Sequence, residues 1–133
     1  MLTAILCIAE AIYFEARNQP QEGQLAVANV IINRTKSQQY PDHPCDVVRQ
    51  GRHKHNFPIK YKCQFTYYCD GLKETVRDKP AYGQAVINAT IVFYGWIPDN
   101  TDGATHYHAD YVSPSWADSF QVSAKINKHI FYK

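Results

Sequence analysis

The 133-residue chain contains no long apolar segment free of charge, and that absence excludes several classes of protein. The one apolar run near the N-terminus is interrupted by Glu10 and Glu15, so it fits neither a signal peptide nor a membrane-spanning helix. Charge is nearly balanced, with 14 Lys and Arg against 12 Asp and Glu, and no basic arm indicates nucleic acid. We therefore expect no encoded signal peptide, no membrane insertion and no nucleic-acid partner.

Cysteine is also scarce, with four residues at positions 7, 45, 63 and 69, too few to define a disulfide scaffold in a domain of this size. Cys7 falls within the apolar N-terminal segment, where we expect it to be a buried apolar residue. Cys63 and Cys69 flank a short gap that a local loop can close, and we predict a disulfide there, subject to its geometry. These cysteines leave the redox compartment open.

Tyrosine, in contrast, is abundant, with ten residues in the chain. A flat ring with a polar hydroxyl suits contact with sugars or peptides, although it also packs well in ordinary cores. The length predicts a single domain over residues 1–133 with one hydrophobic core. The net charge of +2 is compatible with an anionic polymer as partner.

Hydrophobic spacing predicts three main helices. Apolar residues recur at three- and four-residue intervals over residues 2–17, and again over 81–96 after Pro80. Pro20 fits a first helical position, and the apolar stretch 23–36 that follows indicates a buried helix. The shorter elements that we expect are a helix near 45–50, strands around 63–68 and 104–112, a helix at 113–120 and a hairpin over 125–133. The predicted fold class is therefore α+β, mainly helical.

One glutamate ends the first predicted helix, in the sequence AIYFEAR. Ile12 and Ala11 lie three and four residues before Glu15, so its carboxylate emerges beside apolar side chains. Burial and the negative end of the helix dipole would both raise the pKa of this carboxylate. A glutamate held protonated near neutral pH is what a general acid requires. The alternative is an ion pair with Arg17 or Arg34 that only braces the helix end.

Four ordered segments resemble a single family of proteins. The stretch IYFEARNQPQEGQLAVANVIINR has the E-A-R, E-G-Q, A-V-A and N-R pattern of the cell-wall hydrolases typified by spore-cortex-lytic enzymes. KCQFTYYCDG resembles their C-Q-F-S-W-x-C-D-G block, ATHYHADYVSPSWA their A-x-x-Y and W segment, and KINKHIFYK their I-G-x-H-x-F ending. The chain departs from this pattern at Phe14, Asn18, Gln19, Thr66 and Tyr67. These departures concern the shape of the sugar subsites more than the chemistry.

The resemblance implies a lysozyme-like fold that cleaves the glycan strands of peptidoglycan, with Glu15 as the catalytic acid. Lytic transglycosylases, which the family resembles, use one glutamate to protonate the leaving oxygen and then to accept the proton of the sugar's C6 hydroxyl. The product is a 1,6-anhydro-muramyl end. By the same resemblance, the substrate-binding residues are Gln64, Phe65, Tyr67, Tyr107 and His108. Each tyrosine fits a half-buried core position equally well.

Glu22 is the nearest further acid in the sequence, and a glycosidase that works with two carboxylates needs such a residue. Its place near the start of the second predicted helix makes helix capping at least as good an explanation. We do not assign Glu22 as a nucleophile, and the predicted catalytic set contains Glu15 alone.

Histidines form two clusters that partly match zinc sites. The sequence HYHAD at residues 106–110 has an H-x-H-x-D spacing, but Tyr111 follows where a further histidine ligand is expected. The other cluster, of His43, Cys45, His53 and His55, matches no standard zinc spacing and lies in a polar segment. Exposure or groove lining is the better interpretation of both, and we expect no metal and no organic cofactor.

We therefore predict a monomeric lytic transglycosylase that cuts the MurNAc–GlcNAc linkage of peptidoglycan glycan strands. The alternatives are a hydrolytic muramidase, a zinc amidase or peptidase, and a non-catalytic cell-wall-binding module. The expected site of action is the bacterial cell wall, in the periplasm or outside the cell. A small domain without a signal peptide fits a phage lysin released from the host cytoplasm, and a fragment of a larger secreted bacterial protein would have the same features.

Overall fold

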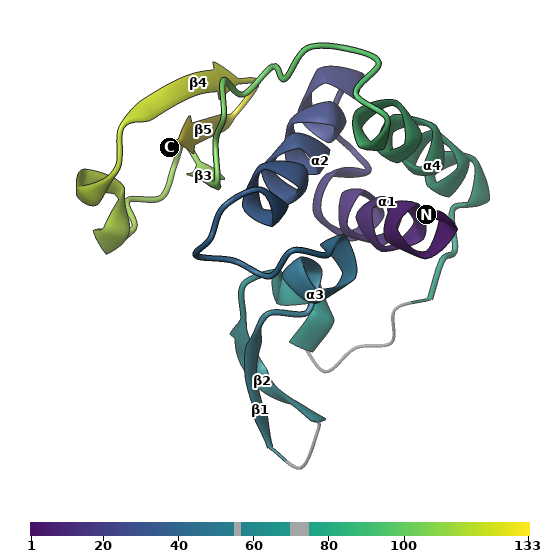
Figure 1. Cartoon of the computed structure of the whole chain (residues 1–133), viewed down its shortest axis with the longest axis horizontal. Helices are drawn as coiled ribbons and strands as arrows, with labels where there is room; N and C mark the ends of the chain where they lie inside the picture. Colours follow the sequence, from purple (N-terminus) through teal and green to yellow (C-terminus); the bar gives the residue numbers. More distant parts are fainter. Residues whose placement is uncertain (55–56, 70–74) are drawn as a thin grey trace.

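Three helices of 15 residues form the centre of the structure, a computed structural model that describes residues 1–54, 57–69 and 75–133 (Figure 1). Two small antiparallel sheets complete this described part, so the expected mainly helical α+β class is confirmed. No helix within these ranges is both long enough and apolar enough to span a membrane. In chain order the elements are α1 (Leu2–Ala16), α2 (Gln21–Thr35), α3 (Pro44–Val48), β1 (Gly51–Lys54), β2 (Phe57–Cys63), the 3₁₀ helix η1 (Thr66–Cys69), α4 (Lys79–Phe93), β3 (His106–Ala109), the 3₁₀ helix η2 (Ser115–Ser119), β4 (Val122–Ile126) and β5 (His129–Tyr132).

The core lies where α1, α2 and α4 pack together (Figure 1). Ile8 and Ile12 on α1 are fully buried, as are Ile31 on α2 and Ala89 on α4. Residues spaced by three and four positions share one face of a helix, which explains why these side chains meet in the core. Each buried isoleucine stabilises the fold by on the order of 1.5–3 kcal/mol through removal of apolar surface from water. The end of α1 that carries Glu15 is therefore anchored in a rigid layer.

The helix boundaries follow the prolines of the sequence closely. α2 begins at Gln21, one position after Pro20, which was predicted as its first helical residue and instead caps the helix. Pro80 lies in the first turn of α4, as predicted, and the Asp78 side chain caps that turn. The helix ends at Phe93 rather than at residue 96, because the chain turns at Gly95, whose φ of 68° lies in the left-handed region.

A three-stranded antiparallel sheet, in the order β3-β5-β4, packs against α2 on the side away from α1 and α4 (Figure 1). Phe131 of β5 is buried against Ala26 and Val30 of α2. The hairpin predicted over residues 125–133 is confirmed as β4 and β5. Its turn needs no glycine because Asn127 takes a positive φ of 54°, which asparagine tolerates. This sheet positions β3, and with it Tyr107, beside α2.

A second hairpin, β1 with β2, extends from α3 away from the helical layer (Figure 1), where the sequence pattern predicts loops. The strand predicted around residues 63–68 is wrong. β2 ends at Cys63, and the chain bends at Gln64 into η1. The Gln64 nitrogen donates to the Gln50 carbonyl over 3.0 Å, and the Tyr68 nitrogen donates to the Phe65 carbonyl over 3.1 Å, which closes the helical turn. The alternation of a strand therefore does not apply to Gln64 and Phe65.

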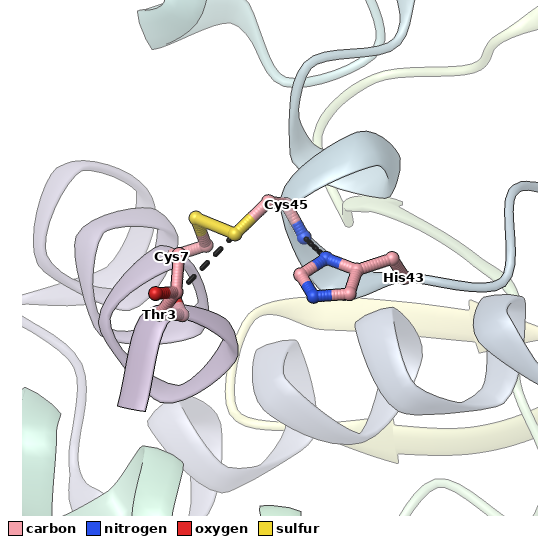
Figure 2. The surroundings of a disulfide bond; sticks show 4 residues. All are labelled: Thr3, Cys7, His43 and Cys45. Carbon is pink, nitrogen blue, oxygen red and sulfur yellow. Dashed lines mark hydrogen bonds between the residues drawn. A yellow bond between two sulfur atoms is a disulfide. The ribbon is translucent and has the colours of Figure 1, made fainter. Parts of the chain in front are cut away.

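Cys7 is buried as expected, but it does more than fill apolar space, because it forms a disulfide with Cys45 (Figure 2). The bond joins α1 to α3, and the His43 ring accepts a hydrogen bond from the Cys45 nitrogen over 3.1 Å. No local pattern indicates this bond, since 38 positions separate the two cysteines. Cys63 is disulfide-bonded as well. The side chain of Cys69, its expected partner, lies outside the described part of the structure, so that pairing stays a prediction.

Candidate active site

Glu15 is half-buried in the last turn of α1 and borders a cavity of about 240 Å³. The cavity wall comes from α1, α2, the bend after β2, β3 and η2. Among the described side chains that line it, Glu15 is the only carboxylate. The other lining residues are Arg34, Gln64, Phe65, His106, Tyr107 and Trp116.

A buried hydrogen-bond network fixes the end of α1. The Gln24 side-chain nitrogen faces the backbone carbonyls of Arg17 and Gln19, at 3.4 and 3.3 Å, and its oxygen accepts a bond of 2.8 Å from Asn88 of α4. Gly23 allows the first turn of α2 to lie close to Gln19, in the segment that follows α1. A Cβ atom at position 23 would lie only 3.0 Å from the Gln19 Cβ. The segment EGQ therefore positions the helix end that carries the predicted acid.

Glu15 also borders a second cavity, of about 210 Å³, on the segment that follows it. This cavity is lined by residues 14–19, which include Phe14, Arg17 and Gln19. Space therefore lies next to the Glu15 side chain in two directions. An acid that protonates the oxygen between two sugars needs room for a sugar on each side.

The two cations that the sequence offers as ion-pair partners for Glu15 also contact other residues. The Arg17 guanidinium carbon lies 4.9 Å from the centre of the Tyr13 ring. The Arg34 Nε atom donates to the Thr105 carbonyl over 2.7 Å. These two contacts help to hold the guanidinium groups in place.

Arg34 is the buried cation of the cavity wall, with 5% of its surface exposed. Its guanidinium lies between two rings, 4.9 Å from the centre of Tyr40 and 5.5 Å from that of Phe65. Burial lowers the pKa of Arg34, while the hydroxyl groups of Tyr40 and Tyr107 act in the opposite direction. An arginine remains charged at neutral pH despite such a shift. The described cavity wall therefore combines one cation, Arg34, with one carboxyl group, that of Glu15.

His106 is held by hydrogen bonds at both ring nitrogens, to the Tyr40 hydroxyl at 3.1 Å and the Thr105 hydroxyl at 2.9 Å. Burial and the charge of Arg34 lower the pKa of His106, which favours a neutral ring at neutral pH. The ring packs 5.2 Å from that of Trp116, centre to centre. His106 thus supports the aromatic wall of the cavity.

Tyr107 brings a hydroxyl group close to the predicted acid. Burial raises the pKa of Tyr107 well above its ordinary value, the negative charge of Glu15 adds to the shift, and Arg34 opposes it. The phenol is therefore protonated at neutral pH and available as a hydrogen-bond donor. Its ring stacks on Phe131, with centres 5.4 Å apart, which fixes the orientation.

The predicted substrate-binding residues differ in where they lie relative to the Glu15 cavity. Gln64 is exposed at the cavity, and Phe65 and Tyr107 line it with Glu15. Tyr67 is buried outside this lining and stacks on Phe14 with ring centres 5.1 Å apart. Burial raises the pKa of Tyr67, as do the nearby carboxylates of Glu10 and Glu15.

His108 lies elsewhere, in the wall of a separate cavity of about 400 Å³. Its Nε2 atom is 2.7 Å from the Tyr132 hydroxyl, and both rings pack against Trp116. Alternation along β3 puts His106 and His108 on the same face, but only His106 lines the Glu15 cavity, so alternation does not explain the separation. Among the described residues, no group of three or more histidine, cysteine or acidic side chains is placed to hold a metal ion.

Sequence reasoning did not assign Arg34, His106 and Trp116 to the site. Arg34 carried a usable signal, since it follows Val27, Val30 and Ile31 on the apolar face of its helix, where a charge is unusual. Glu22 is exposed in the first turn of α2, but α2, which is described in full, has no side-chain cap hydrogen bond at its start, so the capping role of Glu22 stays a prediction. Glu22 lies outside the described lining of the Glu15 cavity.

Comparison with known proteins extends these observations. Residues 18–132 match the profile of a family described as Cell Wall Hydrolase. The spore cortex-lytic enzyme of Oceanobacillus iheyensis is 32% identical over 129 residues, which is 97% of this chain and 41% of that protein. The enzyme of the same name from Halalkalibacterium halodurans is 35% identical over 128 residues, 96% of this chain and 34% of that protein. The chain thus spans less than half the length of these curated relatives.

Two solved structures share the fold over the whole chain. The catalytic domain of a germination-specific lytic transglycosylase, SleB from Bacillus anthracis, matches with a TM-score of 0.73 and 32% identity, over 96% of that domain. The catalytic domain of the Bacillus cereus SleB protein matches with a TM-score of 0.71 and 30% identity, over 91% of its length. These alignments confirm the expected lysozyme-like fold. They include Glu15, which lies just before the range that the family profile matches.

Proposed function

The chain belongs to the cell wall hydrolase family, and from this membership we propose that it is a lytic transglycosylase that cleaves the MurNAc–GlcNAc linkage of peptidoglycan. The observation that carries the proposal is the position of Glu15 between two cavities at the end of α1. It is the only carboxylate in the described lining of the larger one. A single acid in this position supports a mechanism that needs one carboxylate and no second acid.

In this mechanism the protonated Glu15 donates its proton to the oxygen that links the two sugars, as the bond between that oxygen and C1 of the muramyl residue breaks. The C6 hydroxyl of the same muramyl residue then attacks C1, and its proton passes to the Glu15 carboxylate. A bond from C6 oxygen to C1 replaces the glycosidic bond, and no water is consumed. Glu15 ends the cycle protonated, ready for the next linkage.

The cavity wall supplies the other interactions that this reaction needs. Tyr107 lies near Glu15 and presents a protonated hydroxyl, which stabilises a carboxylate or binds a sugar oxygen. Gln64 is exposed at the cavity, where its amide can donate to and accept from sugar hydroxyls. The half-buried Trp116 ring offers an apolar face for a pyranose ring.

The proposed site of action is the cell wall, outside the cytoplasmic membrane. The disulfide between Cys7 and Cys45 supports this location, because such bonds persist in oxidising compartments. A phage lysin that reaches the wall of its host and the catalytic part of a larger secreted wall enzyme both fit these features.

The direct test of the proposal is digestion of purified sacculi by the chain and by Glu15→Gln. The variant keeps the size and hydrogen bonding of the side chain but cannot deliver a proton, so turnover should fall by at least ~100-fold. Glu22→Gln is the matched control, since it changes an exposed acid outside the cavity, and it should cost little activity. If EDTA abolishes clearing of the sacculi and zinc restores it, the result supports a zinc amidase instead. If the chain binds sacculi without cutting them, the result supports a wall-binding module.

A further inference from the structure

Arg34 combines burial, charge and incomplete hydrogen bonding in the wall of the Glu15 cavity. It is 95% buried, because only 5% of its surface is exposed. Its Nε atom is bound to the Thr105 carbonyl at 2.7 Å, and its Nη1 atom is buried without a hydrogen-bond partner among the residues that the structure describes. A buried donor of a charged group is rarely left without a partner in native structures. The site therefore has an unfilled requirement for an acceptor.

The surroundings of Arg34 hold the guanidinium rigidly. Tyr40 and Phe65 contact it through their rings, and the bond to Thr105 fixes the Nε side. The cavity that it shares with Glu15 and Tyr107 is the open space next to it. A ligand acceptor that enters this cavity approaches a guanidinium that is already oriented, which reduces the entropy lost on binding.

The chemistry of the substrate identifies the acceptor. Both sugars of the glycan strand carry an acetamido group, which is neutral. Only the muramyl residue has a lactyl group as well, which ends in a carboxylate when it bears no peptide and in a carbonyl when it does. Carboxylate is the planar acceptor that matches a guanidinium best.

We propose that Arg34 binds the lactyl carboxyl group of a muramyl residue in the cavity and thereby determines the preference for muramyl over purely N-acetylglucosamine glycans. The inference rests on the proposed function and adds a specificity residue to the site. Arg34 touches the substituent that distinguishes the two sugars, while Glu15 acts on the bond between them.

The experiment compares the binding of two tetrasaccharides to the Glu15→Gln protein, so that neither ligand is cut. One ligand is chitotetraose, and the other is the alternating GlcNAc–MurNAc tetrasaccharide without peptide. Isothermal titration should show a preference for the muramyl ligand. Adding Arg34→Gln should lower the ratio of the two affinities by about 10- to 100-fold, which is the usual effect of losing a hydrogen bond to a charged group.

Lys36→Gln in the same background is the matched control. Lys36 directly follows α2, the helix that carries Arg34, and it is exposed. Lys36→Gln therefore removes one positive charge, as Arg34→Gln does, without changing the cavity. Its affinity ratio should stay that of the parent. Circular dichroism and thermal unfolding establish whether Arg34→Gln folds.

A change on the ligand makes the test independent of that variant. Methyl esterification of the lactyl carboxyl removes its charge, and the ester should bind the Arg34-containing protein about 10-fold or more weakly than the free acid. Equal binding of ester and acid, or an equal loss of both tetrasaccharides in a folded Arg34→Gln protein, overturns the inference. If the chain cuts sacculi while either of these results holds, the proposed function stands and only the role of Arg34 fails. If it neither binds nor cuts any glycan, both fail.

Discussion

The Asn88 side-chain nitrogen donates a hydrogen bond of 2.8 Å to Gln24 Oε1, and both residues are buried. The nitrogen of the same Gln24 side chain reaches the carbonyls of Arg17 and Gln19, which directly follow the helix that carries Glu15. This pair therefore links α4 through α2 to the end of α1. The position of the predicted acid depends on polar contacts from two other helices.

Asn88→Ala should lower both stability and activity. The change leaves Gln24 Oε1 buried without its strongest partner, which costs about 1–3 kcal/mol in the free energy of unfolding. Because the end of α1 becomes less well fixed, turnover on sacculi should fall as well. Urea unfolding and a clearing assay measure the two effects. Gln84→Ala is the control, since Gln84 is exposed and its contact with Asn88 is 3.4 Å long, and neither quantity should change.

Asp99 gives a pH-dependent contribution to stability. Burial opposes its ionisation, but hydrogen bonds from Thr101, Asn33 and Gly103 outweigh burial and lower the pKa of Asp99. Since the folded pKa lies below the unfolded one, the stabilisation is complete above about pH 4 and is lost as pH falls through the folded pKa. Asp99→Asn should lower the free energy of unfolding by about 1–2 kcal/mol at pH 7. The loss is no larger because Asp99 is partly exposed, and solvent weakens its interactions.

The check is denaturant unfolding of both proteins from pH 7 down to pH 2. The difference between them should shrink below pH 4. Asp102→Asn removes an exposed acid that pairs with Lys133 at 3.1 Å, and it should have little effect at any pH. A difference for Asp99→Asn that stays constant down to pH 2 contradicts the assignment.

The disulfide between Cys7 and Cys45 should stabilise the fold without contributing to the chemistry. The double variant Cys7→Ala and Cys45→Ala removes a cross-link between residues 38 positions apart, which should lower the free energy of unfolding by about 2–4 kcal/mol. Activity at low temperature should be retained, since neither residue lines the cavity in its described part. A variant as stable as the parent would show that the bond does not form in the protein.

Tyr107→Phe separates a role in the site from a role in the core. The ring and its stacking on Phe131 remain, but the hydroxyl near Glu15 is lost. We expect kcat to fall by about 10-fold or more and the melting temperature to change little. Tyr111→Phe, at a ring that is 83% exposed, is the control and should behave like the parent. A large drop in melting temperature with unchanged kcat would assign Tyr107 to the core instead.

Local patterns predicted the helices and the C-terminal hairpin, because their signals lie within a few residues. Apolar spacing and the prolines at 20 and 80 placed α1, α2 and α4 within a few positions. The hairpin of β1 and β2 and the bend at Gln64 could not be predicted this way. They depend on a contact with Gln50, which lies fourteen positions earlier and leaves no mark in the local pattern.

The site was predicted in part for the same reason. Glu15 came from its helix position and from resemblance, and Gln64, Phe65 and Tyr107 came from resemblance alone. His108 was placed in the site, yet the structure puts it in a separate cavity, while its neighbour His106 lines the cavity with Glu15. Arg34 carried a local signal for burial, but its contacts with Thr105, Tyr40 and Phe65 join separate segments and could not be read from any one of them.

The mass of the new muramyl ends formed in ¹⁸O-labelled water tests most directly the central claim that the cleavage is non-hydrolytic. Sacculi digested by the chain should give fragments whose muramyl ends are lighter by one water than those of hydrolysis and carry no ¹⁸O, because the C6 hydroxyl replaces water as the nucleophile. Fragments that carry one ¹⁸O at the new muramyl end would contradict the account and identify a hydrolysing muramidase.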